Sequence, residues 1–171
     1  MTMGRYLCKK ASHMKIIKLF ACLLFLFGNY SGYSQKTNFE VTSPNGELKV
    51  SVNLSDKIYY SILAGNEELT SKNHLGLILR NETLGLNPKL SASKTGKVNE
   101  LIKPDVPLKF STVANTYNYL LLNFKGGYSV EFRAFDQGVA YRFITAKKGD
   151  IEVLNEDFAV NFPTDYLLHL Q

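Results

Sequence analysis

Tryptophan is absent from this 171-residue sequence, and cysteine and histidine are scarce. Both cysteines, Cys8 and Cys22, precede the part of the chain that shows strand patterns. The part after residue 34 therefore has no disulfide, no thiolate metal site and no cysteine nucleophile. Its two histidines, His74 and His169, lie too far apart in the sequence for a zinc-ligand spacing such as His-x3-His.

Long apolar runs are also missing. The longest, Leu19–Phe27, has nine residues, whereas a membrane-spanning helix needs about 20. Lysines precede this run, and Gly32 and Ser34 put small residues just before Gln35, as a signal-peptidase site requires. We therefore predict a signal peptide and upstream leader over residues 1–34, a mature exported chain without a stable membrane span, and a periplasmic location.

Cys22 offers an alternative to simple cleavage. Leu19-Phe20-Ala21-Cys22 loosely resembles a lipobox, in which the cysteine would carry a lipid anchor. The apolar run continues past Cys22, however, and a lipobox normally closes that run. Cleavage after Ser34 is the favoured interpretation.

The positive charge of the sequence is confined to the leader. The net charge is +5, and residues 1–34 hold five basic and no acidic side chains, which leaves 15 of each sign in the rest. A balanced domain gives no argument for a nucleic-acid partner.

Period-two alternation dominates from Phe39 onward, and no window of helical length has a helical apolar stripe. Leu48–Leu54 is a clear example, preceded by the turn residues Ser43–Gly46. Residues 81–106 suggest two weak edge strands with long loops. Further strands are expected at Ile58–Leu63, Glu67–Thr70, Leu75–Leu79, Leu108–Val113, Tyr117–Phe124, Tyr128–Phe135 and Val139–Thr145, with Gly65-Asn66 as a two-residue hairpin turn between the first two.

About ten such strands without interleaved helices predict an all-β sandwich or barrel over residues 35–171 and exclude a parallel α/β fold. The segment Tyr128–Phe143 is expected to form a hairpin with Asp136–Gly138 as its turn and the glycine at positive φ. Arg133 and Arg142, on its neighbouring strands, can both pair with Glu131 or with the aspartate of the turn.

Four motifs occur in a characteristic order: Thr42–Gly46 followed by Leu48–Val50, then Leu75–Leu77, Tyr119–Phe124 and the hairpin. In this order they resemble the amino-terminal domain of family 97 glycoside hydrolases, the α-glucosidases and α-galactosidases of Bacteroidetes. The resemblance covers nearly all of residues 38–171. It implies an antiparallel β-supersandwich similar to galactose mutarotase, packed against a (β/α)8 catalytic barrel that follows it in the chain.

The resemblance also implies where the chemistry lies. In that family the acid and base carboxylates and most calcium ligands come from the barrel, whose substrate would be an α-linked oligosaccharide. The sequence stops at Gln171, before such a barrel. We therefore expect a fragment that is inactive alone, with no catalytic or metal-binding residue and no cofactor of its own, whereas the complete enzyme would use Ca2+. Gln137 departs from the family, which often has an acidic residue there.

The carboxylates agree with that expectation. Glu67–Glu68 and Glu156–Asp157 are adjacent pairs, whose members point to opposite faces of a strand, whereas a glycosidase pair must face one sugar across about 5 to 9.5 Å. His74 with Glu131 or Glu152 remains a candidate for mutarotase chemistry, although a surface histidine is the favoured interpretation.

Tyrosine rings can stack on sugars, although most are expected in the core or in cross-strand pairs. The candidates are Tyr59, Tyr60, Tyr117, Tyr119 and Tyr128. Two hypotheses follow. The chain is the accessory sandwich of an exported α-glycosidase, helping to shape its sugar-binding cleft, or it is a self-contained carbohydrate-binding or mutarotase-like module. The lack of tryptophan weakens the second hypothesis.

Overall fold

The computed structural model describes residues 36–106, 109–165 and 167. The predicted signal peptide, Cys22 and His169 lie outside these residues. Within them, no helix combines the length and apolar character needed to cross a membrane.

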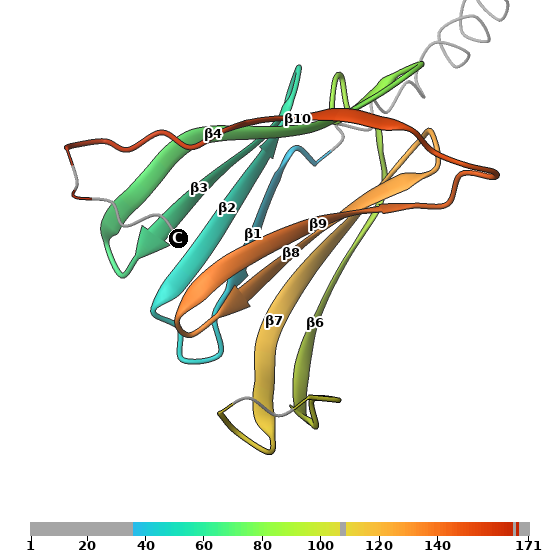
Figure 1. Cartoon of the computed structure of the whole chain (residues 1–171). Coiled ribbons are helices and arrows are strands. Elements are labelled where there is room, and N and C mark those ends of the chain that lie inside the picture. Colours follow the sequence, from blue (N-terminus) through green and yellow to red (C-terminus); the bar gives the residue numbers. More distant parts are fainter. Residues whose placement is uncertain (1–35, 107–108, 166, 168–171) are drawn as a thin grey trace, which may run out of the picture. The chain divides into compact units, whose positions relative to one another are not determined.

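The described residues form ten strands in two antiparallel sheets (Figure 1). Sheet A has the strand order β1-β2-β3-β4-β10, with β5 paired to β4, and sheet B has the order β6-β7-β8-β9. The strands of sheet A are β1 (Asn38–Thr42), β2 (Leu48–Leu54), β3 (Ile58–Ala64), β4 (Glu67–Leu79), β5 (Thr83–Leu84) and β10 (Val153–Ala159). Those of sheet B are β6 (Leu90–Ile102), β7 (Val113–Phe124), β8 (Tyr128–Phe135) and β9 (Gly138–Thr145). The expected all-β antiparallel sandwich is confirmed.

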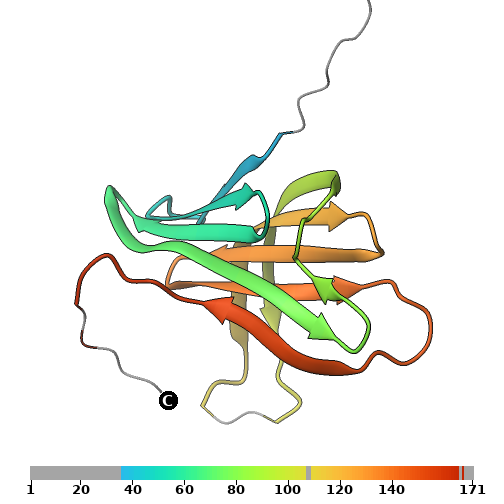
Figure 2. The ribbon, with the colours of Figure 1, turned by 90° about the horizontal axis from the view of Figure 1, so that it is seen from above.

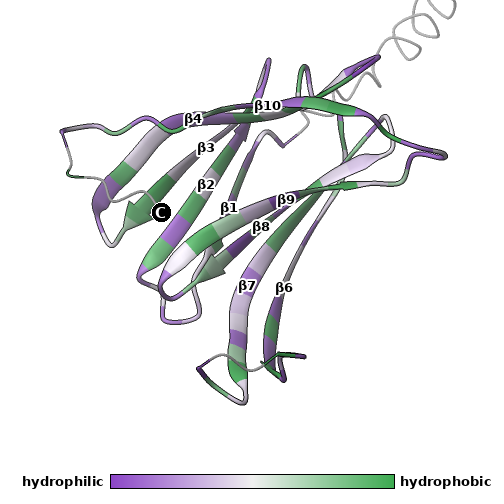
Figure 3. Ribbon diagram, in the orientation of Figure 1, coloured by the Kyte–Doolittle hydropathy of each residue, from purple (hydrophilic) through white to green (hydrophobic). Residues whose placement is uncertain are grey.

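Alternating apolar residues bring the two sheets together, and Figure 3 shows the alternation along the strands. Val50 and Val52 of β2 and Val130 and Phe132 of β8 are almost completely buried in one core. Each such side chain contributes about 1.5 to 3 kcal/mol by leaving water. The core also includes Phe39, Leu54, Ile58, Tyr60, Leu75, Leu120, Leu122 and Phe124.

Two of the predicted turns are confirmed. Residues Ser43–Gly46 turn the chain between β1 and β2, with Gly46 at a φ of +82°. Gly65 and Asn66 connect β3 to β4, and Gly65 has a φ of +57°. Glycine suits both places because it lacks the Cβ that disfavours positive φ.

The prediction for Gly138 is wrong. Gly138 has no positive φ, because it is already the first residue of β9 and pairs with Phe135 in extended backbone. Asp136 and Gln137 alone form the turn. The Asp136 carboxylate accepts a hydrogen bond of 2.9 Å from the backbone N–H of Asn45. This bond connects the turn to the loop between β1 and β2.

The prediction of two edge strands in residues 81–106 is confirmed, since β5 pairs only with β4 and β6 only with β7, but the long loops expected around them are wrong because β6 is long. Apart from the short β5, this segment contains one long strand, β6, which pairs with β7 from Leu90↔Phe124 to Ile102↔Val113. Backbone hydrogen bonds to β7 hold a polar sequence that could not form a strand by its own hydrophobicity. The described residues 109–112 of the expected strand Leu108–Val113 are not in a strand, and β7 begins at Val113.

Strand β10 returns the chain from sheet B to the edge of sheet A. Figure 2 shows it beside β4, after a wide loop from β9. Asp157 of β10 forms ion pairs with Lys57 at 2.9 Å and His74 at 3.1 Å on the outer face of the sheet. These contacts connect the last described strand to β4 and to the start of β3.

Candidate functional site

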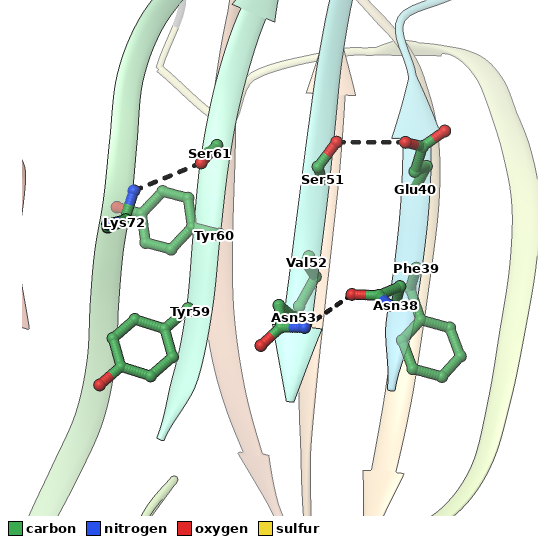
Figure 4. A pocket seen from close by; sticks show the side chains of 10 residues that line it. All are labelled: Asn38, Phe39, Glu40, Ser51, Val52, Asn53, Tyr59, Tyr60, Ser61 and Lys72. Atoms are coloured by element: carbon green, nitrogen blue, oxygen red, sulfur yellow. Dashed lines mark hydrogen bonds between the residues drawn. The ribbon is translucent and has the colours of Figure 1, made fainter. Parts of the chain in front are cut away.

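An open hollow of about 570 Å³ lies on the outer face of sheet A (Figure 4). Ligand pockets typically have volumes of about 300 to 1,000 Å³, and the volume of this hollow lies within that range. Outward-facing residues of β1, β2 and β3 form its floor because alternate residues of each strand point away from the core. The side chains that carry its chemistry are Asn38, Glu40, Ser51, Asn53, Tyr59 and Ser61.

Hydrogen bonds order these polar side chains across the strands. Asn53 Nδ2 donates to Asn38 Oδ1 at 2.6 Å, and Ser51 Oγ donates to Glu40 Oε1 at 3.3 Å (Figure 4). Asn38 and Asn53 are direct cross-strand partners, as are Glu40 and Ser51. The amide and hydroxyl groups of the hollow therefore belong to two hydrogen-bonded cross-strand pairs, which restrict the motion of these side chains.

The wall of the hollow at β4 contains a β-bulge. Pairing between β3 and β4 shifts between Tyr60↔Asn73 and Ile62↔Thr70, and Lys72 has a φ of +51°. Its amide donates to Ser61 Oγ at 3.3 Å. Positive φ is uncommon for residues other than glycine, and bulges often redirect side chains next to functional sites.

A buried asparagine supports this bulge. Asn73 Nδ2 donates to Thr70 Oγ1 at 2.7 Å, while Asn73 Oδ1 accepts a bond of 2.7 Å from the Asn161 amide. Asn161 Nδ2 in turn donates to the Lys72 carbonyl at 2.9 Å. The segment after β10 therefore helps to hold the unusual backbone of β4.

Glu131 is the main buried carboxylate of sheet B. It points to the outer face, where Arg133 Nε lies 2.5 Å from one of its oxygens and Arg142 Nη2 lies 2.7 Å from the other. Burial raises the pKa of the Glu131 carboxyl, but the hydrogen bonds from the two arginines lower it more, so the net pKa is below its ordinary value. Of the two partners that the sequence left open for both arginines, Glu131 and Asp136, the structure shows Glu131.

Of the five candidate tyrosines, Tyr60, Tyr117 and Tyr128 are buried. Tyr117 packs against Phe135 on the outer face of sheet B, with the Arg133 guanidinium 4.7 Å from its ring centroid. Only Tyr59 and Tyr119 remain half-exposed, and Tyr59 lies in the hollow.

The mutarotase arrangement of His74 with Glu131 or Glu152 does not form. His74 pairs with Asp157, Glu131 lies between its two arginines on the other sheet, and Glu152 forms a two-pronged ion pair with Arg80. The Tyr141 hydroxyl donates to Glu156 at 2.6 Å on the opposite face of β10 from Asp157, as alternation requires.

Within the described part of the chain, no three His, Cys, Asp or Glu side chains gather in an arrangement that could hold a metal ion. Sequence reasoning identified the Glu131 cluster from strand register. It missed the hollow, because cross-strand neighbours such as Asn38 and Asn53 carry no local motif. It also missed Asn73, because nothing in the local sequence indicates that this polar residue is buried.

The fold and these sites define an all-β sandwich module with a hollow on the outer face of sheet A, lined by polar side chains and by Tyr59. The chain belongs to the Glycosyl-hydrolase 97 N-terminal family, whose model matches residues 41–171.

A curated relative is the retaining α-galactosidase of Bacteroides thetaiotaomicron, 35% identical over 149 residues that cover 86% of this chain and 22% of the relative. A solved family 97 enzyme from Pseudoalteromonas sp. strain K8, in complex with acarbose, is 25% identical with a TM-score of 0.60, covering 70% of this chain and 20% of that one. A β-arabinopyranosidase structure, 24% identical with a TM-score of 0.65 over 73% of this chain and 21% of that one, shares the fold. The chain spans about a fifth of the length of these relatives.

Proposed function

We propose that this chain is the amino-terminal sandwich of an exported α-glycoside hydrolase, that it supports the catalytic barrel and shapes its sugar-binding cleft, and that it does not hydrolyse glycosides alone. The observation that carries the proposal is the family match over residues 41–171, together with a relative that is a retaining α-galactosidase. The α-linked oligosaccharide and the (β/α)8 barrel as partner follow from the family resemblance.

The placement of the carboxylates supports a non-catalytic role. Glu131 is neutralised by two arginines, and Asp157 is bound by Lys57 and His74. A glycosidase needs one carboxyl group to give a proton while a second attacks or activates water across the same anomeric carbon. A carboxylate held by cations is a poor proton donor, since its pKa is lowered, as it is for both of these groups.

An apolar margin of the sandwich supports docking of a further domain. Phe158 pairs with Leu75 of the core, so both side chains are on the inner face of sheet A. Phe158 is nevertheless 57% exposed, and Val160 just beyond β10 is 44% exposed. In sheet B, β9 is an edge strand. No described strand lies beyond it to cover this margin.

Most ligands of the calcium ion of the complete enzyme would come from the catalytic barrel, as the family resemblance implies. Among the described residues the acidic side chains do not gather into a set of three or more, whereas Ca2+ takes six to eight oxygen ligands. The described residues therefore do not fit the ion on their own.

Turnover by the chain itself tests the proposal. The chain should release no p-nitrophenol from p-nitrophenyl α-glucoside or α-galactoside, with or without calcium. Deleting the matching segment from the Bacteroides thetaiotaomicron α-galactosidase should abolish its activity or its folding. Turnover by the purified chain that disappears in Glu131→Gln or Glu152→Gln would overturn the non-catalytic assignment, and a fully active deletion variant would overturn the supporting role.

The export signal is a separate part of this proposal. The run of apolar residues after two lysines and the small residues before Gln35 support cleavage and a periplasmic location. Sequencing the amino terminus of the exported protein should yield a chain that starts at Gln35. A lipid-modified Cys22 as first residue would contradict it.

A further inference from the structure

We propose that the hollow on the outer face of sheet A binds a neutral oligosaccharide, with the Tyr59 ring as the stacking platform and the amides of Asn38 and Asn53 as hydrogen-bonding groups (Figure 4). The proposal rests on the proposed function only for the choice of α-linked sugars. The presence of the site rests on its geometry.

The chemistry of the lining suits a polyhydroxylated ligand. The bond between Asn53 and Asn38 uses one amide donor and one lone pair, so the remaining amide donors and acceptors are available to a ligand. The hydroxyls of Ser51 and Ser61 can each donate and accept. Sugar hydroxyls need this mixture of donors and acceptors, whereas an anion would need donors alone.

The charges of the hollow also disfavour an ionic ligand. Glu40 is an acid and Lys72 a base, and Lys49 lies 3.8 Å from the Glu40 carboxylate. The charges of Glu40 and Lys72 cancel within the lining, and Lys49 beside it adds a single positive charge, so the hollow has no strong charge that would draw in an ion. A neutral ligand avoids the free-energy cost of removing water from a charged group.

Tyr59 is held in place before any ligand arrives. The His74 ring meets it edge to face, with 6.4 Å between centroids and an interplanar angle of 71°. Its hydroxyl donates weakly to Asp56 at 3.4 Å. A ring with restricted motion loses little entropy on stacking, which favours binding by the flat apolar face of a sugar.

The bulge at Lys72 gives the site a second, independent feature. Lys72 has a positive φ although it is not glycine, and such strained conformations cluster at ligand sites. The buried amide of Asn73 and its bonds to Thr70 and Asn161 maintain this conformation. At the bulge Ser61 has no pairing partner on β4, and its hydroxyl accepts a hydrogen bond from the Lys72 backbone amide at the rim of the hollow.

Titration of the ¹⁵N-labelled full chain with maltotriose tests the proposal. Amide shifts should be confined to β1, β2, β3 and the bulge of β4, and they should saturate with a millimolar dissociation constant, about 4 kcal/mol of binding at 1 mM. Tyr59→Ala should weaken binding about three- to tenfold. Cellotriose, the β-linked probe, should bind more weakly than maltotriose.

Tyr119→Ala is the matched control, because Tyr119 is also half-exposed but lies over Gly96 on the outer face of sheet B. It should leave maltotriose binding unchanged. No shifts up to about 50 mM sugar, shifts centred on sheet B, or equal binding by Tyr59→Ala would overturn the site. Equal binding of cellotriose would overturn the α-linked choice. None of these results depends on whether the chain hydrolyses glycosides, so the two proposals fail separately.

Discussion

Gly85 shows how a single residue without a side chain can join the two sheets. It follows β5 at a φ of +91°, and its amide donates to the Tyr128 hydroxyl of β8 at 3.2 Å. A Cβ at this position would lie 2.8 Å from the Leu75 carbonyl oxygen. Both the backbone conformation and the close approach of β4 therefore require glycine.

Replacing Gly85 should destabilise the sandwich. Gly85→Ala is expected to lower the free energy of unfolding by about 1 to 3 kcal/mol from the backbone conformation alone, with a further cost for the contact with β4. Urea unfolding of the full chain measures the change.

Gly138→Ala is the control for this change, since Gly138 has no positive φ and an added Cβ would meet no atom within 4 Å. It should change stability by less than about 0.5 kcal/mol. Equal effects of the two substitutions would contradict the assigned backbone.

At the scale of elements, Glu131 connects β8 to β9. The carboxylate is 9% exposed and accepts hydrogen bonds from Arg133 on its own strand and from Arg142 directly across the hairpin. Strand alternation alone predicts that Glu131 and Arg133 share a face, so this contact follows from sequence. The choice of Glu131 rather than Asp136 does not, because Asp136 is occupied by the Asn45 amide from a distant loop.

Glu131→Gln should lower the free energy of unfolding by about 1 to 3 kcal/mol at neutral pH, because it removes the charge that both arginines bind. The pKa of Glu131 is lower in the folded than in the unfolded chain. Its contribution is therefore complete above the unfolded pKa of about 4.3 and is lost as the pH falls through the lower folded pKa. The stability difference should be constant from pH 7 to about 5 and shrink below that.

Glu40→Gln is the matched comparison, since Glu40 is 61% exposed and its nearest cation is 3.8 Å away. Exposed ion pairs contribute little, so this variant should lose less than about 1 kcal/mol at any of these pH values. Urea unfolding at several pH values measures both variants. A Glu131→Gln difference that grows as the pH falls would contradict the assigned ion pairs.

On the scale of the whole molecule, the apolar margin at β10 is the surface through which the described unit is expected to contact other domains or molecules. Phe158 and Val160 are exposed next to the core, and such surfaces mark interaction sites or aggregation risks. In the proposed enzyme, the catalytic domain would cover this margin.

The chain alone should therefore self-associate or bind a hydrophobic dye, as light scattering and dye fluorescence would measure. Phe158→Ser should reduce the dye signal more than Leu101→Ser, because Leu101 is exposed on the β6–β7 hairpin, away from the core. A monomer without dye binding, or an equal effect of both substitutions, would count against the margin as a docking surface.

The elements whose patterns are local could be predicted from the amino-acid sequence alone. Val50 and Val52 alternate with polar residues, so β2 was predictable to the residue, and the same holds for β8. Gly65-Asn66 specified its hairpin because the turn conformation depends on those residues alone. The other elements depend on contacts between distant parts of the chain. β6 is a strand because β7 pairs with it, and the bulge at Lys72 exists because Asn73 and Asn161, 88 positions apart, hydrogen-bond across the sheet. Such long-range pairing leaves no periodic trace in either segment, because its energy comes from partners that only the folded chain brings together.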